Sequence, residues 1–208
     1  MEKVKLTKGE LKRQRDALLQ YQRYLPTLQL KKQQLQMEIL HQGTVLAARR
    51  TASERQARDM EVWLGLLGDP MLKTDLRQWA APVEIVTGSK NIAGVDLPVF
   101  ENAKFAETEY DLFAVPAWVD TATVELQKLV SLREEIAVIG HGVAVLRQEL
   151  RITTQRVNLF EKVKIPEAEE AIRRIKIYIG DQMANAVGRS KIAKRKIEEA
   201  FAEEALTA

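Results

Sequence analysis

The chain of 208 residues carries 32 basic and 29 acidic side chains, giving a net charge of +3. It contains no cysteine, which excludes disulfide bonds and thiolate metal sites and fits a reducing compartment. No stretch reaches the uninterrupted apolar length of a transmembrane helix, and the N-terminus lacks the apolar core of a secretory signal. We therefore expect a cytoplasmic protein with no direct membrane insertion.

Residues 1–67 contain a seven-residue apolar repeat, which is the seam pattern of a left-handed coiled coil. Thr7 and Glu10 match a capping box, so we predict that a long helix begins there and ends near Gly68. Pro26 lies inside the pattern and is expected to kink the helix. The two apolar columns, three residues out of phase, are Leu11, Leu18, Leu25, Ile39 and Leu46, and Tyr21, Leu28 and Leu35.

The helical period is lost over residues 68–119. Val83–Thr87 and Val95–Val99 alternate in the manner of half-buried strands, with a loop predicted over Gly88–Gly94. We predict a small β-hairpin within a head at the bend of the chain. A two-stranded hairpin alone is marginal in water, so it must pack on the helices or on a partner. The candidate partner-binding residues of this head are Ile92, Val95, Leu97 and Phe100.

Residues 120–208 contain the second heptad run, with Asp120 as the predicted N-cap of a second long helix. Pro166 interrupts the run, and apolar residues from Ile172 to Val187 resume in a shifted phase. The two columns before the interruption are Leu129, Ile136, Val143, Leu150 and Val157, and Leu132, Ile139, Leu146 and Phe160.

The two heptad runs can pair antiparallel about the bend, with position i opposite about position 187 − i. This places Pro26 near residue 161, so both helices are expected to bend at a similar height. The second helix outruns the first by about 25 residues, or roughly 35–40 Å, leaving Gly180 to Leu206 protruding. We predict a mainly α fold, a long antiparallel two-helix coiled-coil hairpin with a small β-hairpin-containing head, built as one continuous unit.

Charge is unevenly distributed along this hairpin. Residues 1–24 hold seven basic and three acidic side chains, residues 59–111 hold four basic and ten acidic, and residues 189–196 hold no acid. Either these are solvated helix faces, or the basic end and the acidic bend meet different partners. The candidate partner-binding residues of the basic end are Lys8, Lys12, Arg13, Arg189, Lys191, Lys194 and Arg195.

The sequence offers no set of residues for catalysis or for holding a cofactor. Pairing brings His41 close to His141, but no cysteine or carboxylate completes a metal site, so we interpret both as ordinary helix histidines. There is no Walker loop and no Ser/His/Asp set. The basic segments lack interleaved aromatic residues for base stacking, which argues against nucleic acid. We expect a protein that is not an enzyme and binds no cofactor, metal or nucleic acid.

Three segments carry the pattern of a known family. They are Leu6–Leu11, then Val83–Val86 with Asn91–Glu101, and then Gln155–Glu161 followed by Ile165-Pro166 and Ile172–Ile175. Together they resemble the D subunit of the V-type (A-type) ATP synthase or ATPase, and the likeness spans nearly the whole chain. The first helix departs from the family pattern between Tyr21 and Leu30.

The resemblance implies a non-catalytic central rotor stalk that transmits torque between the catalytic A/B hexamer and the ion-translocating membrane ring. It also implies that the F subunit binds beside the coiled coil and that the C subunit (named d in eukaryotes) lies at the bend end, above the ring. The protein would then be cytoplasmic and peripheral to the membrane. The alternative is a coiled-coil adaptor or tether unrelated to the ATPase, which would expose its seam or dimerise through it.

Overall fold

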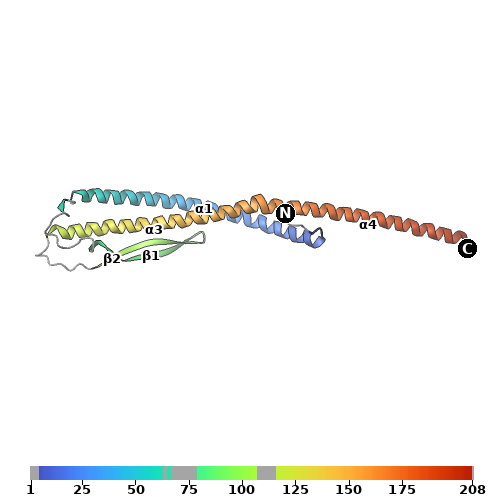
Figure 1. The fold of residues 1–208 in the computed structure, drawn as a ribbon, viewed down its shortest axis with the longest axis horizontal. Coiled ribbons are helices and arrows are strands. Elements are labelled where there is room, and N and C mark those ends of the chain that lie inside the picture. The colour runs from blue at the N-terminus through green and yellow to red at the C-terminus, as the bar shows by residue number, and fades with distance from the viewer. Residues whose placement is uncertain (1–4, 63–64, 67–78, 107–115, 208) are drawn as a thin grey trace. The chain divides into compact units, whose positions relative to one another are not determined.

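The computed structural model describes residues 5–62, 65–66, 79–106 and 116–207, with the side chains of residues 201–207 left aside. The described chain is mainly helical and contains a two-stranded antiparallel sheet, as predicted (Figure 1). Its elements are α1 (Lys8–Glu61), β1 (Pro82–Ile92), β2 (Val95–Phe105), α3 (Trp118–Leu159), the π-helix η2 (Phe160–Lys164) and α4 (Ile165–Thr207). The chain divides into two compact units, residues 30–154 and residues 1–29 with 155–208.

Helix α1 begins at the predicted cap. The Glu10 N–H donates to Thr7 Oγ1 over 3.2 Å, and the Leu11 N–H donates to the Thr7 carbonyl over 3.0 Å. The helix is continuous across Pro26 and ends at Glu61, seven residues before the predicted end. Gly68, the predicted stop signal, lies outside the described residues.

Helix α3 begins at Trp118, two residues before the predicted start. The Val119 N–H donates to the Pro116 carbonyl over 3.0 Å and closes the first turn. Asp120 therefore lies within the first turn instead of capping it, where its negative charge favours the helix N-terminus. The residues of all four predicted seam columns are buried or half-buried, which confirms the heptad pattern.

In the unit formed by residues 30–154, α1 and α3 are antiparallel. Lys31 Nζ lies 2.9 Å from Glu149 Oε1, and Arg49 Nε lies 2.8 Å from Glu135 Oε1. The rule of 187 − i predicted that Lys31 lies opposite residue 156. It lies instead opposite Glu149, seven residues earlier in the chain. The arithmetic was wrong because it took both helix ends at the bend too late in the sequence.

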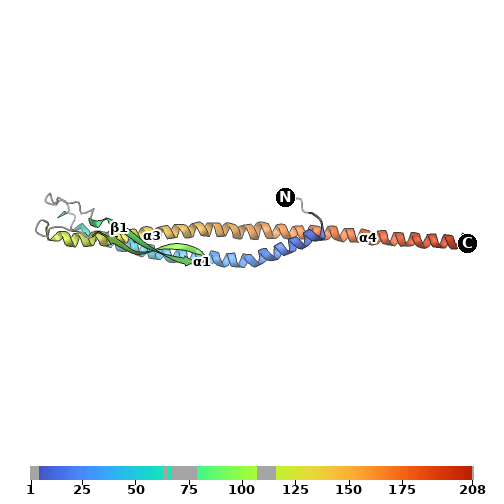
Figure 2. The ribbon, with the colours of Figure 1, turned by 90° about the horizontal axis from the view of Figure 1, so that it is seen from below.

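The β-hairpin packs on this helix pair and shares its core (Figures 1 and 2). Leu35 of α1, Val95 and Leu97 of β2 and Leu146 of α3 form one buried cluster. The partly buried side chains around it are Ile39, Ile92, Ala93, Val145 and Leu150. The hairpin thus obtains from the helices the apolar burial that a two-stranded sheet needs for stability.

The loop predicted over Gly88–Gly94 is wrong, because the strands continue through it. Gly88 pairs with Val99, Ile92 pairs with Val95, and only two residues connect the strands. Those residues, Ala93 and Gly94, have φ values of 53° and 74°, the left-handed conformation of the tight turns that suit twisted hairpins. Gly88 lies within the strand, and a Cβ there would meet only the end of the exposed Glu101 side chain, which can move aside.

In the unit formed by residues 1–29 and 155–208, the described part of α1 packs beside the second long helix. The ring centroids of Tyr21 and Phe160 lie 5.4 Å apart. Tyr21, and not Pro26, therefore lies at the level of residue 160, so the prediction that the two prolines share one height is wrong. At Phe160 the helix changes to a π turn, in which the Ile165 N–H donates to the Phe160 carbonyl, five residues back.

The π turn accommodates one extra residue in the seam. Val157 is buried, and the next inward residue two turns on is Ile165, eight positions later instead of seven. Beyond it the buried residues Ala168, Ile172 and Ile175 resume a three-four spacing. An uninterrupted heptad would direct toward α1 the charged residues Lys164, Glu167 and Arg174. The shifted phase predicted after Pro166 is confirmed, and the π turn is its structural basis.

The last part of α4 is uncovered within its unit. Every residue from Gly180 to Ala200 is exposed, whereas Ile175 is fully buried. This agrees with the predicted helical tip, although residues near the start of the chain still lie beside α4 as far as Ala186. No helix in the described ranges is long and apolar enough to cross a membrane.

Candidate partner-binding surfaces

The residues predicted to present the hairpin to a partner lie mostly on its inner side. Val95 and Leu97 are 9% and 4% exposed, and Ile92 packs against the same cluster. Phe100 is half-buried. Val95 and Leu97 therefore attach the hairpin to α1 and α3, and a partner would reach them only if the hairpin detached.

The hairpin also carries exposed apolar residues. Val83, Ile85 and Val99 are exposed. The regular pairing of Lys90 with Leu97 and of Gly88 with Val99 keeps Val99 on the same face as Leu97, as alternation along the strand predicted.

The register skips Glu101 between the pairs Val86–Asn102 and Thr87–Phe100, which makes a β-bulge. A bulge inserts one residue and shifts the alternation beyond Phe100, so that the half-buried Phe100 and the buried Ala103 are three positions apart. A regular strand pattern does not reveal this feature.

The predicted basic residues of α4 are all exposed, on the unpaired tip. Two of them are partly neutralised along the helix, since Lys194 lies 3.6 Å from Glu198 and Arg195 lies 3.4 Å from Glu199. The Arg189 Nε donates to the Asn185 carbonyl over 3.4 Å. The tip is therefore less strongly basic than residues 189–196 alone suggest.

The predicted basic residues at the start of α1 are also exposed, and Arg13 forms an ion pair with Glu10 at 3.2 Å. Lys8 lies beside a groove of about 420 Å³, an arrangement that the sequence analysis missed. The groove is lined by residues at the start of the chain and by residues in the middle of α4. They are Leu6, Lys8, Tyr178, Ile179, Gln182, Met183 and Ala186. One predicted basic residue of α1 thus lies beside the root of the α4 tip.

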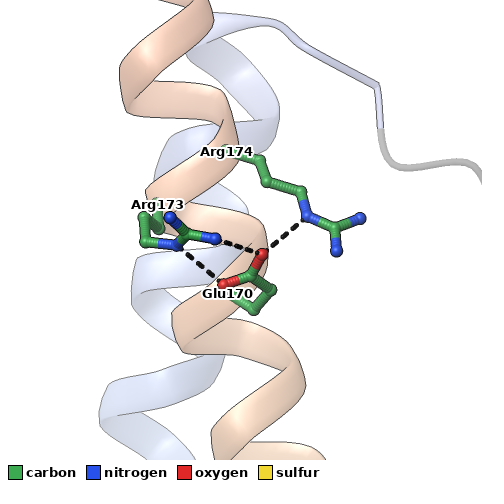
Figure 3. A network of polar contacts seen from close by, with 3 residues as sticks. All are labelled: Glu170, Arg173 and Arg174. Atoms are coloured by element: carbon green, nitrogen blue, oxygen red, sulfur yellow. Dashed lines mark hydrogen bonds and ion pairs between the residues drawn. The ribbon is translucent and has the colours of Figure 1, made fainter.

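Helix α4 also carries a compact charge network (Figure 3). Glu170 accepts hydrogen bonds from Arg173 Nε and Nη2 and from Arg174 Nε, each 2.8 Å long. The hydrogen bonds from Arg173, followed by those from Arg174, lower the pKa of Glu170 to about 2. Glu170 raises the pKa of Arg173 in return, chiefly through the hydrogen bond. The network holds two cations and one anion on the exposed side of the helix.

His41 and His141 are both exposed. Among the residues that the structure describes, no three His, Cys, Asp or Glu side chains are grouped to hold a metal ion. The features found are instead exposed apolar residues on the hairpin, an exposed helical tip and the charge network of Glu170. With its paired helices, the chain is a coiled-coil protein.

Comparison with known proteins gives the family. The family model for the ATP synthase D subunit matches residues 10–195. The V-type ATP synthase D subunit of Borreliella burgdorferi is 40% identical over 197 residues, which cover 95% of this chain and 96% of that protein. The V-type ATP synthase D subunit of Chlamydia trachomatis serovar L2 is 34% identical over 197 residues, covering 94% and 97%. The chain belongs to the ATP synthase D-subunit family, as its resemblance predicted.

Proposed function

We propose that this protein is the central rotor stalk subunit of a V/A-type ATPase, transmitting torque between the catalytic A/B hexamer and the membrane ion-translocating ring. The observation that carries the proposal is the match to the D-subunit family over residues 10–195. The curated relatives are themselves named as D subunits of V-type ATP synthases. In this role the chain performs no catalysis, needs no cofactor and lies on the cytoplasmic side, peripheral to the membrane.

The geometry of each unit suits a shaft. Buried seam residues such as Leu35, Leu146 and Ile175 contribute roughly 1.5–3 kcal/mol each on full burial, which opposes separation of the helices. The cross-helix pairs Lys31–Glu149 and Arg49–Glu135 are compatible with the axial register of α1 against α3 but are partly exposed and contribute little energy. The buried seam residues are what oppose sliding of the two helices, and a helix pair that does not slide can carry torque.

The exposed tip and the start of α1 are the proposed contacts with the A/B hexamer. The residues are those predicted from the sequence, Lys8, Lys12, Arg13, Arg189, Lys191, Lys194 and Arg195. The F subunit is the proposed partner beside the coiled coil, and the C (d) subunit is the proposed partner at the bend. The hairpin residues Ile92, Val95, Leu97 and Phe100 contribute to the proposed contact with the C (d) subunit. They do so by holding the hairpin in place on the helices.

The proposal is tested by truncating the chain after Asp181 and reconstituting it with the A, B and F subunits. We expect ATP hydrolysis by the hexamer to continue while rotation of a bead attached to the stalk weakens or stops. The control removes only residues 203–208, which should leave rotation intact. Full rotation by the long truncation would remove the tip from the mechanism.

Native mass spectrometry separates this function from an unrelated adaptor. One copy of the chain bound to three A and three B subunits is the expected result. An adaptor would instead stay free, or form a dimer indifferent to the A and B subunits, and either observation would refute the stalk assignment.

A further inference from the structure

Both helices of the unit formed by residues 1–29 and 155–208 contain a proline that removes a backbone hydrogen bond. In an α-helix the N–H of each residue donates to the carbonyl four residues back. Pro26 has no N–H, so the Gln22 carbonyl of α1 loses its regular donor. The helix continues through this point, and one bond of its ladder is missing there.

A second bond is missing in the π turn. In an α turn the donor to the Glu161 carbonyl is Ile165, and in a π turn the donor is Pro166. The Ile165 N–H donates instead to the Phe160 carbonyl. Pro166 has no N–H to donate. The Glu161 carbonyl therefore lacks both of these donors.

The two carbonyls without their helix donors lie at the same level of the helix pair. Tyr21 and Phe160 are in contact, with ring centroids 5.4 Å apart. Gln22 directly follows Tyr21, and Glu161 directly follows Phe160. Because the helices run in opposite directions, the two carbonyls come level although the two prolines do not.

Little apolar packing covers this level of the second long helix. The four residues Glu161–Lys164 are all exposed. Between the buried residues Val157 and Ala168, only Phe160 and Ile165 are half-buried. A helix opens most easily where few buried contacts and few protected hydrogen bonds hold it, so this level is the weak point of the helix.

The flanking sequence keeps the π turn at this level. Moving it one heptad toward the N-terminus would direct Asn158 and Glu161 toward α1. Moving it one heptad toward the C-terminus would direct Lys164 and Glu167 toward α1. Either shift buries a charged side chain in an apolar seam, which is costly. The weak point therefore has one position along the helix.

We propose that this level is a joint, at which both helices bend while Tyr21 and Phe160 stay in contact. Prolines and π turns are the recognised causes of bending in helices. A packed pair bends where both helices are weakened at one level, because an intact helix would hold its neighbour straight. The carbonyls of Gln22 and Glu161 meet that condition. The inference concerns the chain itself and does not depend on the stalk assignment.

Hydrogen exchange of the full chain, followed by mass spectrometry, tests the joint on both helices. The amides of residues 160–165 should exchange at least tenfold faster than those of residues 141–146, in the regular helix α3. Pro26→Ala restores a donor for the Gln22 carbonyl, so exchange at residues 160–165, on the opposite helix, should slow at least threefold. Exchange at residues 141–146 should not change. Gln20→Ala, an exposed change on α1, is the control and should leave both rates as in wild type.

Spin labels test bending directly, and the absence of cysteine lets each pair of labels be placed alone. Gln155→Cys with Lys176→Cys spans the joint, and Ala137→Cys with Asn158→Cys is the matched pair before it. All four positions are exposed, and both pairs are separated by about 31 Å in a straight helix. The distance distribution from double electron–electron resonance should be about twice as wide for the pair that spans the joint.

The two measurements also show whether the missing bonds cause the bending. With Pro26→Ala and Pro166→Ala together, the distribution across the joint should narrow to that of the matched pair. Equal widths of the two pairs in the wild-type background would overturn the inference. A wide distribution that the two alanines leave unchanged would also overturn it, because the bending would then have another cause. Exchange at residues 160–165 that Pro26→Ala does not slow would show that the two helices do not bend as one joint.

Discussion

Lys31 and Glu149 form an ion pair of 2.9 Å between α1 and α3, at the level where the hairpin turn lies. A Cβ built on Gly94, in that turn, would lie 4.0 Å from Lys31 Nζ. One lysine thus lies where both helices and the tip of the hairpin meet. Its position links the register of the helix pair to the seating of the hairpin.

The energetic value of this pair is expected to be small. Both side chains are about a quarter exposed, so solvent screens the interaction and holding two long side chains costs entropy. A double-mutant cycle with Lys31→Ala and Glu149→Ala, measured by urea unfolding, should give a coupling of less than about 1 kcal/mol. A coupling above about 2 kcal/mol would show that the pair determines stability and not only register.

Leu146 is the residue whose loss should most weaken the core around the hairpin. It is fully buried between Leu35, Val95 and Leu97. Leu146→Ala should lower the free energy of unfolding by about 2–5 kcal/mol, through lost burial and the cavity left behind. Leu40→Ala is the control, because Leu40 is 71% exposed, and it should change stability by less than about 0.5 kcal/mol. Equal effects of the two changes in denaturant unfolding would contradict the position of the core.

The π turn predicts an unusual tolerance to deletion. Removing Val163 restores a seven-residue step between Val157 and Ile165, so the seam residues still face α1. The deletion is made with Pro166→Ala, because a proline inside a regular α-helix costs about 3 kcal/mol. This double variant should melt at or above the temperature of Pro166→Ala alone, as followed by circular dichroism.

The matched control for this prediction deletes Gln148, an exposed residue within the regular helix α3. Its loss rotates all later seam residues by about 100° and turns charged side chains inward, so the melting temperature should fall by many degrees. Similar melting of the two deletion variants would show that the extra residue is not absorbed at Phe160–Lys164.

The network around Glu170 predicts a titration. Because the folded-state pKa is lowered to about 2 from 4.5, the favourable contribution of the carboxylate is present above about pH 4.5 and is lost as pH falls through about 2. Nuclear magnetic resonance of the Glu170 side chain should give a midpoint near 2. In a variant with Arg173→Ala and Arg174→Ala the midpoint should rise toward 4.5. An unchanged midpoint in that variant would assign the lowered pKa to another cause.

Local patterns predicted the seams and the first helix cap, because each depends on residues a few positions apart. The register of α1 against α3 did not follow, since it depends on where each helix ends, and the ends at Glu61 and Trp118 come earlier in the chain than their sequence signals indicate. The bulge at Glu101 was also missed, because its cause lies in pairing with the other strand.

The surfaces were predicted less well than the fold. The basic residues were located from charge alone, and the structure shows them exposed as expected. The exposed apolar residues Leu30, Met37 and Leu40 were overlooked as a surface because they lie among seam residues in the sequence. Only the burial of Leu35 separates the inward column from the outward one. Sequence spacing alone does not show which of two apolar columns on a helix packs against a neighbouring element and which stays exposed.

The exposed apolar residues of α1, Leu30, Met37 and Leu40, also bear on how this protein is handled. An exposed apolar surface promotes aggregation of an isolated chain. A preparation of the chain alone is therefore expected to aggregate more readily as its concentration rises.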